Sequence, residues 1–150
     1  MSNSIHSVLF CCDYNSVRSP MAEGIFKKLI GRRIFVQSAG IYNNLEINGF
    51  SIKVCREIDV ELNRHQVKSL AELEKLGGFV GAFDLVVALT PLALEKIREY
   101  AKFSSLKIEL WEIEEPLNID RNVEETLKSY RKTRDVILER VEDRFKSFLE

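Results

Sequence analysis

The stretch from Val8 to Glu23 constrains the fold most, because an apolar strand, a short loop and a helix start follow one another there. Val8 to Cys11 is a run of strand-forming residues, which is typical of a buried parallel strand. Ser19 and Pro20 predict a helix start, with Ser19 as the N-cap and proline at the first helical position. The pattern predicts an α/β unit whose loop lies at the carboxyl end of a sheet.

Cys12 and Arg18 stand at the two ends of this loop. The first N–H groups of the helix point toward the loop, and the helix dipole favours an anion there. The same groups and the Arg18 charge favour the thiolate form of Cys12. Arg18 is suited to bind two oxygens of a tetrahedral oxyanion in fork geometry. The loop therefore predicts a nucleophilic thiolate that faces a phosphate-like anion.

Two further loop residues fit this interpretation. Asn15 tolerates left-handed backbone angles, which would turn the peptide N–H groups inward. Ser19 is placed to donate its hydroxyl to the Cys12 sulfur. The loop site that we predict comprises Cys12 and Arg18 as catalytic groups, and Asp13, Tyr14, Asn15, Ser16, Val17 and Ser19 as substrate- or phosphate-binding groups.

The run Val-Leu-Phe-Cys-Cys-Asp-Tyr-Asn-Ser-Val-Arg-Ser-Pro-Met-Ala-Glu-Gly resembles the signature loop of the low-molecular-weight protein tyrosine phosphatase superfamily, which includes a branch of arsenate reductases. Further matches follow along the chain: Gln37-Ser38-Ala39-Gly40 after the expected second strand, His65 within Asn63-Arg64-His65-Gln66, and Phe83-Asp84-Leu85-Val86 at the start of the third strand. The resemblance spans nearly the whole chain.

The rest of the chain alternates strands and helices. Strands are expected at 8–11, 34–36, 85–89 and 108–111, and helical spacing follows each of them, ending in a long helix between Leu127 and Phe148. Thr90 and Pro91 predict the start of the helix after the third strand. We therefore expect a four-stranded parallel sheet with helices on both faces, in an α/β fold like that of the low-molecular-weight phosphatases.

Composition agrees with a single small enzyme. A chain of 150 residues, 45% hydrophobic and with a formal charge of -1, suffices for one domain over 1–150 and carries no charge excess that would favour nucleic acid or a membrane. We expect a cytoplasmic protein whose three cysteines stay reduced. His6 and His65 do not suggest a metal site, and no cofactor is expected. The pairs Lys27-Lys28 and Arg32-Arg33 are interpreted as solvated charges.

A general acid is expected after the fourth strand, in Trp111-Glu-Ile-Glu-Glu-Pro116. The superfamily usually has Asp-Pro there, and this chain has Glu115-Pro116, a carboxylic acid one methylene longer. Glu115 is the candidate acid, and Glu114 is the alternative.

The chain departs at several positions from the pattern of the superfamily that it resembles. Val17 stands where many members carry a second loop cysteine, and Leu89 to Leu92 lacks the cysteines of the thioredoxin-linked arsenate reductases. Cys11 and Cys55 are interpreted as core residues. Leu117 and Asn118 replace the aromatic residues that usually follow the acid and proline. Tyr14 and Tyr42 are candidates to wall the substrate slot, and Asp13 is expected to turn to solvent.

Three functions remain open. The first is a metal-independent phosphomonoester hydrolase that acts through a phosphocysteine on a phosphorylated protein or a small aryl phosphate. The second is arsenate reduction, in which an external thiol resolves the adduct on Cys12. The third is an oxyanion-binding module with little catalysis. The oligomeric state is not predicted.

Overall fold

Four parallel strands form the centre of this computed structural model, which describes residues 5–43, 45–102 and 105–149. They are β1 (Ser7–Cys12), β2 (Phe35–Gly40), β3 (Leu85–Ala88) and β4 (Ile108–Leu110), in the spatial order β2-β1-β3-β4. Cys12 pairs with Gly40 and Cys11 with Ala88, so the carboxyl ends of β1, β2 and β3 lie together at one edge of the sheet.

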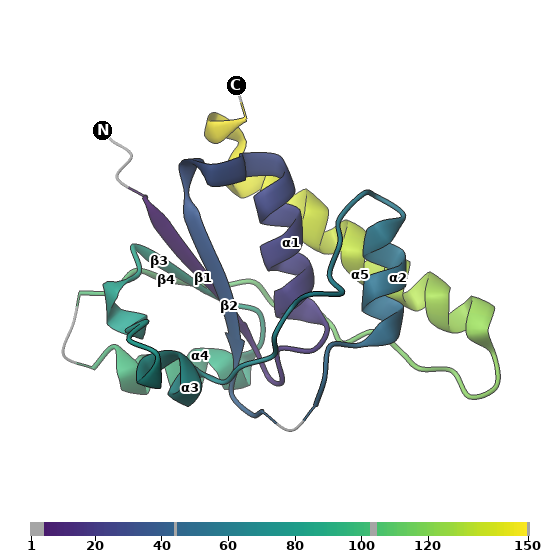
Figure 1. The fold of residues 1–150 in the computed structure, drawn as a ribbon, viewed down its shortest axis with the longest axis horizontal. Coiled ribbons are helices and arrows are strands. Elements are labelled where there is room, and N and C mark those ends of the chain that lie inside the picture. The colour runs from purple at the N-terminus through teal and green to yellow at the C-terminus, as the bar shows by residue number, and fades with distance from the viewer. Residues whose placement is uncertain (1–4, 44, 103–104, 150) are drawn as a thin grey trace.

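Helices cover both faces of the sheet (Figure 1). α1 (Arg18–Ile30), α2 (Gly49–Arg56) and α5 (Val123–Arg144) lie on one face, and α3 (Leu70–Lys75) and α4 (Pro91–Tyr100) lie on the other. Phe10, Phe26 and Phe145 are buried on the first face, whereas Leu9 and Ile97 are buried on the second. The expected single α/β domain with a four-stranded parallel sheet is confirmed.

The element boundaries differ from the prediction in several places. β2 extends to Gly40, so the Gln37-Ser38-Ala39-Gly40 segment lies in the strand and not after it. The long helix ends at Arg144, and Phe148 lies in a short 3₁₀ turn beyond it. α3 was not predicted, although Ser69 and Glu72 form a capping box at its start.

α1 begins two residues earlier than predicted, at Arg18 and not at Pro20. Val17 occupies the N-cap position without a side-chain hydrogen bond, so the prediction that Ser19 caps this helix was wrong. The Ser19 hydroxyl lies 2.9 Å from the Cys12 sulfur and accepts a hydrogen bond from Asn15 Nδ2 at 2.8 Å. A hydroxyl engaged inside the loop is unavailable for capping. Thr90, in contrast, caps α4 as predicted, by accepting the Ala93 N–H at 3.0 Å.

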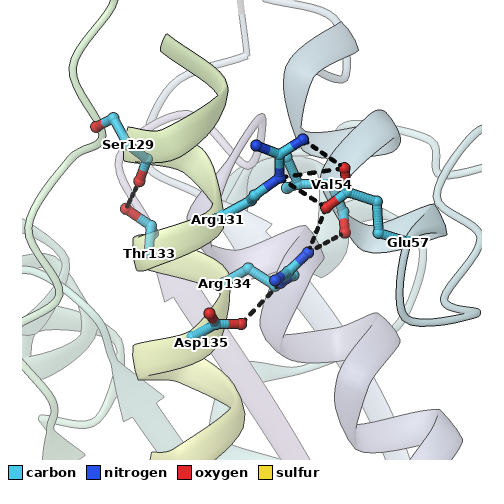
Figure 2. Close-up of polar contacts among 7 residues, drawn as sticks. All are labelled: Val54, Glu57, Ser129, Arg131, Thr133, Arg134 and Asp135. Atoms are coloured by element: carbon cyan, nitrogen blue, oxygen red, sulfur yellow. Dashed lines mark hydrogen bonds and ion pairs between the residues drawn. The ribbon is translucent and has the colours of Figure 1, made fainter. Parts of the chain in front are cut away.

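A charged cluster fastens α2 to α5 (Figure 2). Glu57, just after α2, accepts hydrogen bonds from Arg131 Nη2 at 2.8 Å and from Arg134 Nη1 at 2.7 Å. Arg134 Nη1 also donates to the Val54 carbonyl at 2.7 Å. The hydrogen bond from Arg131, together with that from Arg134, lowers the pKa of Glu57 to about 2. The cluster fixes the C-terminal end of α2 to α5. The N-terminal end of α2 faces the loop after β1.

No helix in the described part of the chain is both long and apolar enough to cross a membrane.

Candidate active site

A cavity of about 310 Å³ opens at the carboxyl end of β1, over the loop that leads into α1. Its floor contains Cys12, whose exposed fraction is only 2%. The residues that line it come from three parts of the chain: Cys12, Tyr14, Ser16, Val17 and Arg18 from the β1–α1 loop, Leu45 and Asn48 from the segment before α2, and Glu115, Asn118 and Tyr130 from the segment after β4 and from α5.

The Cys12 sulfur has two polar contacts with Ser19, in the first turn of α1. The Ser19 hydroxyl is 2.9 Å from the sulfur, and the Ser19 backbone N–H donates to it at 3.4 Å. The sulfur thus faces the positive end of a helix dipole and two potential hydrogen-bond donors. These contacts stabilise the negatively charged thiolate, which is the form of cysteine that acts as a nucleophile.

A buried polar network supports the loop from behind. Asn15 has a left-handed backbone (φ 57°), and its Nδ2 donates to Ser19 at 2.8 Å and to Ser38 at 2.9 Å. Its Oδ1 accepts the Lys68 N–H at 3.1 Å and lies 2.9 Å from His65 Nε2, which must donate there. Burial lowers the pKa of His65. The network fixes Asn15 in the conformation that shapes the loop.

Arg18 is almost fully buried and is oriented by several oxygen atoms. Its Nη1 donates to the Ile113 carbonyl at 3.0 Å. Its Nη2 lies 3.5 Å from Glu115 Oε1 and 3.8 Å from Asp13 Oδ2. The Ile113 carbonyl, after β4, therefore helps to hold the guanidinium at the cavity, where two carboxylates accompany it.

The two candidate acids differ in position. Glu115 lines the cavity that contains Cys12, and its side chain is 69% exposed, so it is open to solvent and to ligands. Glu114 does not line that cavity; it lines a neighbouring one of about 220 Å³, which Glu115 also borders, together with Leu117 and Ser129. Of the two, the geometry favours Glu115 as the group that reaches a ligand above Cys12.

Asp13 does not turn to solvent, contrary to the prediction. Its Oδ1 accepts the Thr90 hydroxyl at 2.7 Å, and only 26% of the side chain is exposed. Its backbone carbonyl accepts the N–H groups of Ile41 and Tyr42, both at 2.8 Å. Thr90 and Arg18 together compensate the carboxylate, which explains why it is tolerated beside an anion site.

Two tyrosines meet at the rim, where Tyr14 and Tyr42 have ring centroids 5.3 Å apart. Tyr14 lines the cavity, and Tyr42, which follows β2, is 46% exposed beside it. The pair is an aromatic surface at the entrance of the cavity.

The wall formed by α5 was missed by sequence reasoning. The Tyr130 hydroxyl donates to Asn118 Oδ1 at 2.9 Å and lies 3.3 Å from Asn48 Nδ2, which donates to it. Burial raises the pKa of Tyr130. Tyr130 fits the apolar spacing of the last helix, so it was assigned to the core. The one available signal was that this apolar position holds a tyrosine and not a phenylalanine, because a buried tyrosine hydroxyl needs a hydrogen-bond partner.

The other two cysteines lie in the core. Cys11 is fully buried, and burial, followed by the proximity of Cys12, raises its pKa well above the ordinary value. Burial also raises the pKa of Cys55 to about 12. All three cysteines are free thiols. Among the described residues no group of three or more His, Cys, Asp or Glu side chains is arranged to hold a metal ion.

Comparisons with known proteins agree with this architecture. The family model for low molecular weight phosphotyrosine protein phosphatase matches residues 7–150. An arsenate reductase of Oceanobacillus iheyensis is 31% identical over 134 residues, which cover 89% of this chain and 91% of that protein. An arsenate reductase of Bacillus subtilis is 29% identical, covering 95% and 96%. The structure of a low molecular weight protein tyrosine phosphatase from T. tengcongensis superposes with a TM-score of 0.74 at 26% identity, covering 96% and 99%.

Proposed function

The chain belongs to the low molecular weight phosphotyrosine protein phosphatase family, and from that premise we propose that it is a metal-independent phosphomonoester hydrolase with Cys12 as its nucleophile. One observation carries the proposal: Cys12 and Arg18, from the loop after β1, line one cavity together with Glu115, from the distant segment after β4. A nucleophile, an oxyanion-binding cation and an acid are the groups that this reaction needs.

In the first step, the Cys12 thiolate attacks phosphorus in line with the leaving group and forms a phosphocysteine. The loop N–H groups and Arg18 hold the equatorial oxygens, where negative charge is concentrated in the transition state. Glu115 gives its proton to the leaving oxygen. Support comes from the Glu115 carboxylate, which lies 3.5 Å from the Arg18 guanidinium and therefore within reach of an anion bound there.

In the second step, water displaces Cys12 from the phosphocysteine. Glu115, now a carboxylate, accepts a proton from the attacking water, and inorganic phosphate leaves. Ser19 stabilises Cys12 as a leaving thiolate, because its hydroxyl and N–H both contact the sulfur. Glu115 thus serves as acid and then as base.

We further propose that the substrate is a phosphorylated protein or a small aryl phosphate. Tyr14 and Tyr42 offer an aromatic surface at the cavity rim on which a phenyl ring packs. Another part of the cavity lining is more polar, because Asn48 and Asn118 lie there and bond to the Tyr130 hydroxyl. The free cysteines suit the reducing conditions of the cytoplasm, the compartment that we propose.

Arsenate reduction is the second candidate, and the names of the curated relatives favour it. Cys12 would attack arsenic with loss of water or hydroxide, and an external thiol would then attack the Cys12 sulfur, giving arsenite and a mixed disulfide. The external thiol is required because Cys11 and Cys55 are buried and remain protonated at neutral pH.

The test compares hydrolysis of p-nitrophenyl phosphate, in the presence of a chelator, by the parent protein and by Cys12→Ser, Arg18→Lys and Glu115→Gln. We expect no turnover for Cys12→Ser and strongly reduced turnover for the other two. Arsenate with glutathione and glutaredoxin is run in parallel. Arsenite formation without ester hydrolysis would assign the reductase. Phosphate binding without either reaction would leave an oxyanion-binding module.

A further inference from the structure

A third cavity, of about 630 Å³, is lined by residues of β2, by residues of α1 and the turn that follows it, and by Lys68. It belongs to no part of the catalytic site described above. Three basic residues, two apolar residues and one amide are among those that line it: Lys27, Arg32, Lys68, Ile34, Val36 and Gln37.

β2 is an edge strand, because among the strands of the described residues only β1 lies next to it in the sheet order (Figure 1). The Phe35 N–H donates to the carbonyl of His6, just before β1, and the N–H of Ile41, just after β2, donates to Cys12. Odd-numbered residues of β2 therefore direct their peptide groups toward β1. Even-numbered residues direct theirs outward, as shown by the Gly40 N–H, which donates to the Lys68 carbonyl at 2.8 Å.

Val36 therefore presents its peptide N–H and C=O groups to the cavity. Within the described residues these groups have no hydrogen-bond partner. The segment around Ser69 pairs with β2 only at Gly40, in parallel orientation. An open strand edge of this kind is a template on which an extended segment adds as a further strand.

The charge around this edge is positive. Glu23, the acidic residue at the cavity, is already paired with Lys27 at 2.7 Å and accepts the Ser38 hydroxyl at 2.6 Å. Arg32 and Lys68 have no ion-pair partner among the residues that the structure places. Charge complementarity therefore selects an acidic ligand.

The Gln37 side chain indicates independently that a hydrogen-bond donor is missing at this cavity. Its Oε1 atom is buried and accepts no hydrogen bond from any described residue. Buried acceptors are normally paired, and each exception needs an explanation. A peptide N–H entering the cavity that Gln37 lines would supply the missing donor.

We propose that the β2 edge binds an extended acidic peptide segment of a partner protein, which adds as a fifth strand beside Val36. Its carboxylates pair with Lys68 and Arg32, and its backbone satisfies the outward groups of β2. A second copy of this chain is disfavoured as the occupant, because two-fold pairing of the edges would bring two basic clusters together. The surface is distinct from the catalytic cavity, so it acts in recruiting a partner.

The probe is a fluorescein-labelled octapeptide of alternating Glu and Val, with binding followed by fluorescence anisotropy and by NMR. We expect the Val36 amide resonance to shift on binding. The double substitution Arg32→Glu with Lys68→Glu should weaken binding at least tenfold, whereas Lys128→Glu with Lys132→Glu on α5 should not change it. Thermal melting of both variants confirms that they are folded.

Two control peptides sharpen the test. The same peptide with N-methylated valines should lose binding, because strand addition needs its N–H groups, and an alternating Lys and Val peptide should not bind. Absence of binding, equal binding of the Lys peptide, or an unmoved Val36 amide would overturn the proposal. So would sedimentation that shows a dimer whose formation excludes the peptide, since the occupant would then be a second copy.

Discussion

Glu115 Oε1 lies 3.5 Å from Arg18 Nη2, although the two residues are separated by most of the chain. Arg18 is held from behind by the Ile113 carbonyl, two residues before Glu115. The segment after β4 therefore positions both the guanidinium and the carboxylate. A change in this segment is expected to affect anion binding and proton transfer together.

Replacement of Glu115 by Gln removes a transferable proton and keeps the size of the side chain. We expect kcat for aryl phosphates to fall by about a hundredfold or more, with a larger loss for substrates whose leaving group is more basic. Glu114→Gln is the matched control and should retain nearly full kcat. Equal losses in the two variants would contradict the assignment of Glu115 as the acid.

Ser19→Ala removes the hydroxyl that lies 2.9 Å from the Cys12 sulfur. Negative charge on sulfur is then less well stabilised, so alkylation of Cys12 by iodoacetamide at neutral pH should slow several-fold. Ser16→Ala is the control, because the Ser16 hydroxyl donates to the Glu46 carbonyl and not to sulfur. Unchanged alkylation of Ser19→Ala would show that the hydroxyl does not act on Cys12.

Asp13→Asn keeps an acceptor for the Thr90 hydroxyl but removes a negative charge 3.8 Å from Arg18. Repulsion of a bound anion decreases, so inorganic phosphate should inhibit about threefold to tenfold more strongly. The inhibition constant measures this directly, with Glu114→Gln as the reference for a more distant charge. Weaker inhibition by phosphate would mean that Asp13 supports the loop more than it repels the ligand.

Glu57 makes folding stability depend on pH. Its pKa of about 2 in the folded protein lies below that of an unpaired glutamate, so its contribution is present above about pH 4.5 and is lost as pH falls toward 2. One third of the side chain is exposed, so we expect about 1–2 kcal/mol. Denaturant unfolding of the parent and Glu57→Gln across this range measures the difference.

The control for this prediction is Glu61→Gln, which removes an exposed pair with Arg56 at 2.8 Å. Its effect on unfolding should be much smaller. A pH dependence between pH 2 and 4.5 that is identical in the parent and in Glu57→Gln would contradict the assignment of that dependence to Glu57.

The three cysteines should differ in reactivity. Burial raises the pKa of Cys55 to about 12 and that of Cys11 as well, so neither forms a thiolate at pH 7. Iodoacetamide in excess should therefore modify the native protein once, at Cys12, as mapped by peptide mass spectrometry. Modification of Cys55 at a comparable rate would show that the α2 region opens in solution.

Much of the fold could be predicted because local patterns and packing agree. The apolar run after Ser7 is a buried strand, Thr90 and Pro91 start α4, and the alternation of elements leads to the parallel sheet. α3 was missed because it spans only Leu70–Lys75 and has too few apolar positions for a helical period, although Ser69 and Glu72 carried a capping signal.

The loop after β1 could be placed from the sequence, but the residues from distant parts of the chain that contact it could not. Asp13 was expected in solvent because the pattern does not show that Thr90, far along the chain, meets it across the sheet. Tyr130 and Asn48 could not be assigned to the cavity for the same reason, because α5 and the start of α2 approach each other only in the folded chain. Long-range contacts between polar groups leave little trace in local periodicity.

The most direct test of the central claim is an acid-quench experiment that traps the covalent intermediate. The parent protein is mixed with p-nitrophenyl phosphate, quenched within the first turnover and digested for mass spectrometry. We predict one phosphoryl group on the peptide that contains Cys12, and none on that peptide in Cys12→Ala. Hydrolysis by Cys12→Ala at the parental rate, or turnover of the parent with no phosphoryl group ever found on Cys12, would contradict the account.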